Sequence, residues 1–496
     1  MMKTTPRSRE RLTFNYGPGT VPSRSVIDAV LASEAQPTFA TAAYAEPRDW
    51  GYFGLLAFTA VLMLRPQDTI RPLEAVHLAE LFAIVGLGPM ILHRFAKRLP
   101  VFRVTPETIG LMFFGVVILA TVPFSVWPGG AFKEFTDAYL KILVVFVLMM
   151  NTLTTPKRLE TVTWLIIVCV GYVAARGVFD YARGVNLIEG GRLAGSIGGI
   201  FGNPNDLALN MVTFLPIAAV VAMSKRHSML RRGTAALIVV LMMATIVFTK
   251  SRGGAVGLVV MLVAFVLLGQ KIRPGFTAMA VAAVLLSTPF MPASFWERMA
   301  SIIDEHQDTV QYTGSREQRR LVMQEGIAAF VERPLTGVGA GQFENYNPPS
   351  RKVRWRETHN VLIQVAADTG IFGLLAFCFL IIRGVMAATA TRRMLKRPRR
   401  PRDPDPLSAV MSDDDRRALH DHTVGTTAAL VGWLTCAMFA SVAYGWTFYY
   451  VLALIVATRE LAHHRLAAAH ALASPRAKTL SVPPARFPRR AVPRMA

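Results

Sequence analysis

Three arginines in this sequence lie in short polar segments, each beside glycine or serine and each close to a long apolar stretch: Arg192, Arg252 and Arg316. The planar guanidinium group matches phosphate oxygens with two parallel hydrogen bonds and keeps its charge. Neighbouring glycines allow the backbone to approach an anion closely, and helix N-termini add N–H donors. These segments therefore predict a phosphate-binding site. The alternative is that each arginine extends to lipid headgroups or caps a loop.

A histidine followed by an asparagine, His359 and Asn360, stands immediately before an apolar stretch that predicts a helix. The positive end of a helix dipole disfavours imidazolium. The ring is therefore expected to stay neutral and to accept a proton as a general base. We expect Asn360 to orient the ring or to bind a sugar hydroxyl. The alternative is a structural histidine, hydrogen-bonded at the edge of the apolar region.

Acidic residues occur within or at the ends of apolar stretches, at Asp180, Asp206 and Asp368. A carboxyl group is costly to bury in an apolar medium, so these residues are candidates for function. Asp206 has a structural alternative, because it could cap the helix that is expected after Pro204.

Several enzyme classes lack their usual signatures here. No pair of carboxylates has the spacing of a glycosidase, no cluster of His, Cys and Asp predicts a metal site, and no P-loop occurs. We expect neither a metal nor a cofactor. Ser251 or Ser315 could be the nucleophile of a Ser-His-Asp hydrolase, but neither lies in the Gly-x-Ser-x-Gly turn of that class.

The elements that must position these residues are membrane helices. Of the 496 residues, 52% are hydrophobic and 17% are charged, whereas about a quarter are charged in soluble proteins. The apolar residues occur in blocks suited to crossing about 30 Å of hydrocarbon. We expect an all-α polytopic membrane protein with about twelve transmembrane helices, at 51–64, 75–92, 107–123, 138–150, 161–179, 206–223, 234–249, 254–269, 276–290, 360–385, 424–442 and 444–458.

Basic residues indicate the orientation of these helices. Every second connection is rich in Lys and Arg, as the positive-inside rule requires of cytoplasmic loops. Both termini are therefore expected in the cytoplasm, with the three arginines and His359 on the opposite side. The same rule accounts for the net charge of +22, which would suggest nucleic acid in a soluble protein. We expect the lipid bilayer as a partner and no nucleic acid. The basic connections are 94–103, 157–158, 225–232, 271–273 and 392–397.

The long outer loop is expected to be partly helical. An amphipathic helix is predicted from Phe295 to Ile303, and a second helix over 315–332 with apolar positions at Leu321, Met323, Ile327 and Phe330. Glycines over 337–341 predict a flexible turn. The chain then divides into a disordered basic cytoplasmic tail (1–48), transmembrane helices 1–9 (49–290), a periplasmic loop (291–358), helix 10 (359–386), a basic cytoplasmic linker (387–423), helices 11 and 12 (424–459) and a basic cytoplasmic tail (460–496).

Taken in order, these motifs resemble the O-antigen ligase and O-antigen polymerase superfamily of bacterial envelope glycosyltransferases, over roughly 190–385. The resemblance implies a GT-C-like fold in the bacterial inner membrane with its active site facing the periplasm. The segments that carry it are Arg192 with Gly202–Asn205, Ser251–Gly254, Ser315-Arg316, Pro334–Gly339, Thr358–Asn360 and Asp368–Leu374.

The resemblance implies a metal-independent transfer of a glycan from undecaprenyl pyrophosphate to an acceptor hydroxyl, with inversion. Arg252 and Arg316, together with Arg192, would stabilise the pyrophosphate, and His359 would take the proton of the acceptor. Four residues would support the site or bind substrate: Asn360, Asn203, Asn205 and Ser251. The acceptor would be lipid A core, another lipid-linked glycan or a protein hydroxyl.

Other functions remain open on the sequence. A Wzy-type polymerase of O-antigen or exopolysaccharide shares the same motifs. A polysaccharide transporter or flippase would use Asp206 and Asp368, but transporters often show internal repeats and broken helices in matching halves, and the sequence suggests neither. A scaffold for envelope assembly would tolerate the loss of His359.

Overall fold

The computed structural model describes residues 49–188, 190–269, 293–300, 314–349, 357–397 and 405–473. It separates into two units, which are described one by one. The larger unit comprises 46–396 and 412–462 and holds the membrane helices. The smaller unit includes a short 3-10 helix, η7 (Pro406–Ala409), and the end of the last helix, where the Arg465 guanidinium donates to the Val410 carbonyl at 3.3 Å.

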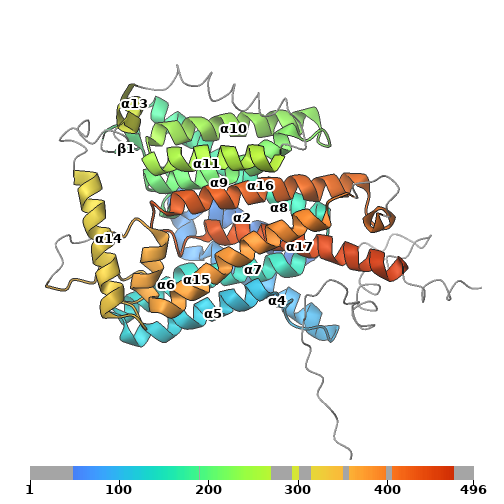
Figure 1. Ribbon diagram of the computed structural model, residues 1–496, viewed down its shortest axis with the longest axis horizontal. Coiled ribbons are helices and arrows are strands. Elements are labelled where there is room, and N and C mark those ends of the chain that lie inside the picture. Colours follow the sequence, from blue (N-terminus) through green and yellow to red (C-terminus); the bar gives the residue numbers. More distant parts are fainter. Residues whose placement is uncertain are drawn as a thin grey trace, which may run out of the picture. The chain divides into compact units, whose positions relative to one another are not determined.

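The described chain is nearly all helical (Figure 1). Within it, eight helical stretches are long and apolar enough to cross a membrane. They are α4 (Leu78–Ala96), α5 with η2 (Pro106–Phe124), α6 to α7 (Pro128–Thr152), α8 (Pro156–Ala182), α9 (Pro204–Met223), α10 (Met229–Thr249), α11 (Arg252–Gly269) and α15 (Val361–Met394). The other longer elements are α2 (Trp50–Leu64), α13 (Ala293–Ala300), α14 (Gly314–Glu332), α16 (Asp413–Ala437) and α17 (Trp446–Ala473).

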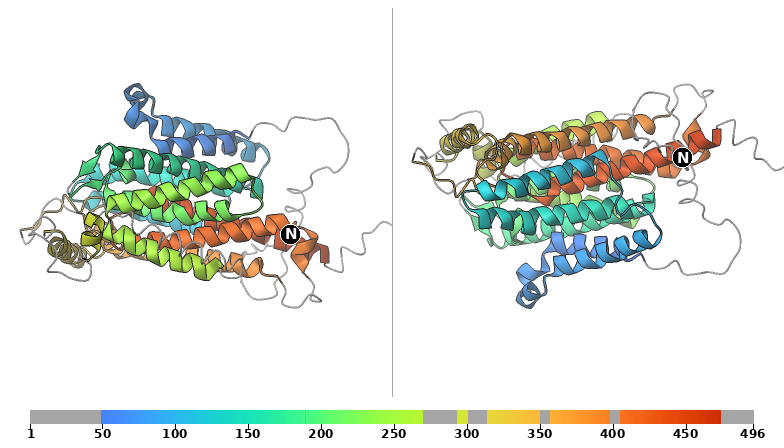
Figure 2. Two further views of the ribbon diagram at one scale, coloured as in Figure 1. Left: turned by 90° about the horizontal axis from the view of Figure 1, so that it is seen from above. Right: turned by 90° about the horizontal axis from the view of Figure 1, so that it is seen from below.

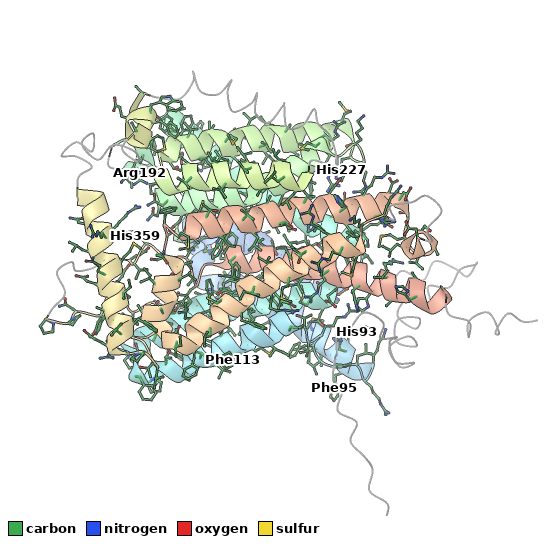
Figure 3. The ribbon with its side chains drawn as sticks, viewed as in Figure 1. His93, Phe95, Phe113, Arg192, His227 and His359 are labelled. Carbon is green, nitrogen blue, oxygen red and sulfur yellow. The ribbon has the colours of Figure 1, made fainter. Side chains whose placement is uncertain are left out.

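The outer surface of these helices suits lipid. Large apolar side chains remain exposed along them, for example Phe95 at 74% and Phe113 at 49%, which Figure 3 labels. In water such a surface would be costly, whereas hydrocarbon accepts it and the helices satisfy their own backbone hydrogen bonds. The prediction of an all-α polytopic membrane protein is confirmed.

The predicted spans agree with the helices, with differences at particular ends. The span predicted at 138–150 is part of a continuous run, Pro128–Thr152, that contains a π-helical turn at Phe135–Tyr139. The span predicted at 360–385 continues to Met394, because hydropathy falls before the helix ends. The span predicted at 276–290 lies outside the described residues. The number twelve therefore stays a prediction.

The centre of the larger unit is α9, which packs against α10, α11 and α16 and is buried along almost its whole length. Figure 1 shows α10, α11, α9 and α16 in adjacent rows. Aromatic rings fill the adjoining core, where Trp433 of α16 stacks on Phe448 of α17 with centroids 4.7 Å apart. This packing fixes the first turn of α9, which carries two candidate residues.

Helix α15 is broken at Gly370, whose φ of 67° and ψ of −162° are not helical. The backbone groups that the break releases pair with the preceding loop: Ile371 N–H donates to the Pro334 carbonyl at 2.8 Å, and the Asp368 carbonyl accepts from Gly339 N–H at 2.8 Å. A break within a membrane helix is tolerated when such partners are present. The sequence suggested no broken helix, because a glycine within an apolar stretch does not reveal its φ angle.

The turn at 337–341 is buried over its first four residues and packs closely on other segments, so the prediction of a flexible turn is wrong. Its glycines Gly337, Gly339 and Gly341 have positive φ, which glycine adopts without strain. A Cβ on Gly339 would lie 2.0 Å from the Ser125 Oγ. Ser125 also donates to the Val338 carbonyl at 3.1 Å. The glycines therefore serve close packing instead of mobility.

The helix predicted over 315–332 is confirmed as α14, which lies across one end of the helix bundle (Figures 1 and 2). The apolar positions named from the sequence are not its most buried ones. Val322 and Ala329 are fully buried, whereas Ile327 is 51% exposed. The face that packs on α15 includes the small residue Gly326, where a Cβ would lie 2.6 Å from Ile363 Cγ2. Part of the other predicted helix is confirmed as α13, and 301–303 lie outside the described residues.

A buried ion-pair cluster joins three membrane helices at the end opposite α14. The Glu107 side chain is fully buried and accepts two hydrogen bonds from Arg459, at 2.7 and 2.8 Å, and one from Arg383 at 2.9 Å. We expect Glu107→Gln to lower the free energy of unfolding by about 3 kcal/mol, because two partly buried guanidinium groups lose their fully buried counter-charge. Thermal unfolding in detergent measures this. Glu460→Gln is the control, since Glu460 pairs with Arg459 nearer the solvent; an equal effect of both changes would contradict the prediction.

Candidate functional site

The candidate residues gather at one end of the bundle, the end that α14 crosses, called the α14 end below. Figure 3 shows Arg192 and His359 at this end, with His93 and His227 at the other. The connections 97–105, 153–155 and 224–228, which are flanked by or contain the predicted cytoplasmic basic residues, join the helices at that other end. Because successive helices run in opposite directions, the basic connections lie at one end of the helix bundle and the candidate residues lie at the other.

Arg192 lies in a small β-hairpin, β1 (Leu187–Ile188) and β2 (Arg192–Leu193), and is 9% exposed. Its Nη2 donates to Asn205 Oδ1 at 2.8 Å and its Nε donates to the Thr249 carbonyl at 3.2 Å. Asn205 Oδ1 also accepts from Ser251 Oγ at 2.9 Å. Three residues predicted from separate motifs therefore form one network, called the Arg192 network below.

The first turn of α9 is shaped by Asn203, which is the N-cap: its Oδ1 accepts from Asn205 N–H at 2.8 Å. The suggestion that Asp206 caps this helix is wrong, because Asp206 already lies inside the first turn. Asparagine is among the preferred N-cap residues, and Pro204 occupies the position where a missing N–H costs nothing. The cap orients Asn205 toward Arg192 and leaves the Asp206 carboxyl for another role.

Arg252 is the first residue of α11 and is partly exposed. Two residues earlier, Lys250 has a left-handed backbone (φ 48°), and its ammonium group donates to the Gly190 carbonyl at 2.9 Å. Ser251 Oγ accepts from Gly254 N–H at 3.2 Å. The turn therefore holds an arginine at the N-terminus of a helix next to the Arg192 network, an arrangement that suits an anion.

His359 precedes α15 with a left-handed backbone (φ 51°), which is uncommon for a residue other than glycine. Its N–H donates to Ser441 Oγ at 2.9 Å. Ser441 Oγ also lies 3.0 Å from the Thr358 hydroxyl, which is 1% exposed. Backbone strain of this kind persists where the surroundings fix it, and it is enriched at active sites.

Asn360 is the N-cap of α15. Its Oδ1 accepts from Leu362 N–H and Ile363 N–H at 3.0 and 3.1 Å, and its Nδ2 donates to the Met438 carbonyl at 3.3 Å. Both ends of the amide are thus engaged in positioning the start of the helix. The role of Asn360 in substrate binding stays a prediction, and the contacts favour a positioning role.

The connection between α16 and α17 joins the two groups of candidates. Its Ser441 holds the backbone of His359, as described above. In the last turn of α16, just before this connection, Cys436 Sγ donates to the Gly253 carbonyl at 3.6 Å. A Cβ on Gly253 would lie 2.9 Å from Phe439 Cβ. Arg252 and His359, 107 positions apart in the sequence, therefore flank one connection.

Arg316 lies in the first turn of α14, as the sequence predicted for a helix that opens near it. Its side chain is outside the described part of the structure. Arg316 stays a predicted pyrophosphate-binding residue.

A cavity of about 380 Å³, called the acidic cavity below, is lined in part by Thr358, the residue before His359. Thr358 and Ser441, both next to the His359 backbone, are part of its wall. Five residues of the wall carry carboxyl groups: Glu134, Asp206, Glu344, Glu357 and Asp368.

Two of these acids, Asp206 and Asp368, were candidates from the sequence, and Glu357 stands two residues before His359. Glu134 and Glu344 carry no sequence signal, because neither lies in a recognisable motif. The same holds for Ser441, which was read as part of an apolar span. Only the packing of distant segments reveals these three residues.

Burial and the neighbouring carboxylates of Asp206 and Glu344 raise the pKa of Glu357 to about 8, from an ordinary value of 4.5. The folded chain therefore keeps a proton on Glu357 that the unfolded chain releases. Stability from this group is complete below about pH 4.5 and is lost as pH rises to about 8.

We therefore expect the melting temperature of the detergent-solubilised chain to fall as pH rises from 5 to about 8, and to fall less in Glu357→Gln. Thermal unfolding at a series of pH values measures the difference between the two proteins. Glu80→Gln is the matched control, because Glu80 is exposed at the α14 end and pairs with Lys141. Parallel pH curves for wild type and Glu357→Gln would contradict the prediction.

Within the part of the chain that the structure describes, no group of three or more His, Cys, Asp and Glu side chains is arranged to hold a metal ion. Residues 237–378 match the O-antigen ligase family. The matched region runs from α10 to α15 and contains Arg252, Arg316 and His359. A search of curated proteins found no match. The resemblance noted over 190–236 lies outside the matched region and stays a prediction.

Proposed function

We propose that this multi-pass membrane protein, which carries an O-antigen ligase domain, transfers a glycan from undecaprenyl pyrophosphate to an acceptor hydroxyl. The observation that carries the proposal is that Arg252 and His359 flank the same connection at the α14 end, next to the Arg192 network. One group suits a leaving pyrophosphate and the other suits a hydroxyl that must lose its proton. The basic connections at the other end support a periplasmic position for the site.

The proposed reaction has a simple balance. The acceptor oxygen attacks the anomeric carbon of the donor sugar from the face opposite the pyrophosphate, which inverts the configuration. The bond from the anomeric carbon to the pyrophosphate oxygen breaks, and its electron pair stays on the departing undecaprenyl pyrophosphate. His359 takes the proton of the acceptor hydroxyl as a general base, a role worth about 10²–10⁴-fold in rate.

The arginines stabilise the charge that grows on the pyrophosphate. In this proposal Arg252 supplies one guanidinium group and Arg316 of α14 supplies a second. Arg192 is held next to the turn that precedes Arg252 by its hydrogen bonds to Asn205 and to the Thr249 carbonyl. Fixed donors of this kind stabilise a transition state without having to reorganise during the reaction. Ser251, Asn203 and Asn205 position the arginines.

Reconstitution tests the proposal. The purified full chain in proteoliposomes receives a glycan linked to undecaprenyl pyrophosphate together with three candidate acceptors: lipid A core, a second lipid-linked glycan and a protein. We expect covalent glycan transfer that continues in excess EDTA. Transfer to lipid A core identifies a ligase, and transfer to the lipid-linked glycan identifies a polymerase. Loss of activity on chelation, or glycan movement across the bilayer without covalent transfer, would overturn the proposal.

A further inference from the structure

The α16–α17 connection holds the start of α15 through several hydrogen bonds. In its middle, Ser441 Oγ accepts from His359 N–H at 2.9 Å. Two residues later, Ala443 N–H donates to Gln364 Oε1 of α15 at 3.0 Å. The Asn360 side chain adds its bond to the first residue of the connection, as described above. The chain around His359 is therefore attached to the connection on both sides.

The Ser441 hydroxyl is both an acceptor and a donor in this arrangement. Thr358 Oγ1 lies 3.0 Å from Ser441 Oγ and donates its own proton to the Asn360 carbonyl at 3.2 Å. Because that proton is already engaged, the proton between the two hydroxyls belongs to Ser441, which donates it to Thr358. Ser441 thus accepts from His359 N–H and donates to Thr358 at the same time, and the direction of its side chain is fixed.

The hydrogen bond from His359 to Ser441 supports an unusual backbone conformation. His359 has a φ of 51°, which a residue with a Cβ adopts rarely and keeps only where its surroundings maintain it. The backbone dihedral angles determine the direction of the Cα–Cβ bond. A relaxation of this residue to an extended conformation would therefore turn the imidazole away from its present position.

The connection is itself well fixed. The Ala443 carbonyl accepts from the hydroxyl of Tyr449, a fully buried residue of α17, at 2.8 Å, and Gly445 N–H donates to the Val442 carbonyl at 3.0 Å. The same connection packs against Gly253 at the start of α11, next to Arg252. It therefore relates the position of the histidine to that of the arginine.

We infer that Ser441 is a positioning residue for glycan transfer: it fixes the backbone of His359 and thereby the place of the imidazole relative to Arg252. The inference rests on the proposed function, in which His359 takes the proton of the acceptor. Ser441 lies beyond the end of the family-matched region at residue 378. A segment outside that region is thus needed to complete the site.

Ser441→Ala in the full chain, assayed by glycan transfer in proteoliposomes, tests the inference. We expect kcat to fall about 10- to 100-fold, because a small misplacement of a reacting group can cost about 10²-fold, while KM for donor and acceptor changes less than about threefold. Ser441→Thr keeps the hydroxyl and is expected to recover most of the lost kcat. A folded Ser441→Ala protein with the kcat of wild type would overturn the inference.

Ser412→Ala is the matched control. Ser412 is the N-cap of α16, and its hydroxyl also accepts a backbone N–H, from Asp415 at 3.0 Å. Its loss is expected to lower the melting temperature slightly and to leave kcat unchanged. An equal fall of kcat in Ser412→Ala and Ser441→Ala would show that lost stability, and not the position of His359, accounts for the effect.

Combining Ser441→Ala with His359→Asn separates positioning from other roles. When no imidazole remains to be positioned, Ser441→Ala should lower the residual rate by less than about twofold. A further loss as large as the one in wild type would mean that Ser441 acts independently of His359, which contradicts the inference. Melting temperatures of the single and double variants are measured in parallel.

Thr358→Val gives a second test that leaves Ser441 in place. It removes the acceptor of the Ser441 proton, so we expect kcat to fall about 3- to 10-fold, the equivalent of one hydrogen bond. Thr358→Ser keeps the hydroxyl and should restore kcat. If Ser441→Ala does not fold, this pair decides the question, and an unchanged kcat in Thr358→Val would refute the positioning role.

The two proposals fail in different ways. If wild type transfers no glycan to any acceptor, the proposed function fails and the positioning role is overturned with it. If wild type transfers glycan and His359→Asn does not, but Ser441→Ala keeps its kcat, the positioning role alone is wrong and the transferase stands.

Discussion

Replacing His359 with asparagine is expected to reduce glycan transfer by about 10²–10⁴-fold, the usual contribution of a general base. Asparagine is the appropriate replacement because position 359 has a positive φ angle, which asparagine tolerates better than alanine. The backbone N–H that donates to Ser441 is also retained. The measurement is initial rate in proteoliposomes at saturating donor, with His359→Ala in parallel.

His93→Asn is the control for this change, because His93 is exposed at the other end of the bundle and is expected to have no effect on rate. Melting temperatures of the three variants separate loss of chemistry from loss of fold. A His359→Asn protein that is folded and transfers glycan at the wild-type rate would remove His359 from the mechanism and favour a scaffold.

Replacing Arg252 with alanine is expected to lower kcat by about 10²–10³-fold, the effect of removing one donor to a developing negative charge. Arg252→Lys should recover only part of the lost kcat, since an ammonium group keeps the charge but cannot form the bidentate hydrogen bonds of a guanidinium group. Because the interaction strengthens in the transition state, kcat should fall more than the donor KM rises. Rates over a range of donor concentrations separate the two parameters.

Arg183→Ala is the matched control, since Arg183 is exposed at the same end and its guanidinium lies over the Phe179 ring, 5.4 Å from the centroid. A change confined to KM in Arg252→Ala would mean that Arg252 binds the ground state and contributes nothing specific to the transition state. An equal loss in Arg183→Ala would indicate a general dependence on surface charge.

The break in α15 affects the choice between an enzyme and a transporter. It was unexpected, because no local pattern indicated a broken helix, and transporters use such helices at their substrate sites. Here the backbone groups released at Gly370 are taken by the loop at 334–339, and the neighbouring Asp368 faces the acidic cavity. The break therefore helps to shape the acidic cavity. Such a cavity is compatible with an enzyme as well as with a transporter. Covalent transfer in the reconstituted system separates the two.

Much of the site could be predicted from the sequence because its signals are local. Glycines beside Arg192 and Arg252, asparagines before two helices, and a histidine at the start of an apolar stretch are all visible within a few residues. The caps at Asn203 and Asn360 show why: the side chain acts on backbone groups two or three positions away. Hydropathy likewise predicts most spans, since each must be apolar along its own length.

Other features depend on segments that are distant in the sequence, so only the tertiary structure decided them. Ser441 holds His359 from 82 residues away, and Arg192 reaches Thr249 from 57 residues away. The acidic cavity collects carboxyl groups from four separate segments, and no local pattern records that they meet. The sequence by itself determined the membrane helices and suggested the candidate residues and the resemblance to O-antigen ligases. Long-range packing decided which of those candidates lie near one another, because contacts between distant helices leave no periodic pattern in the sequence of either helix.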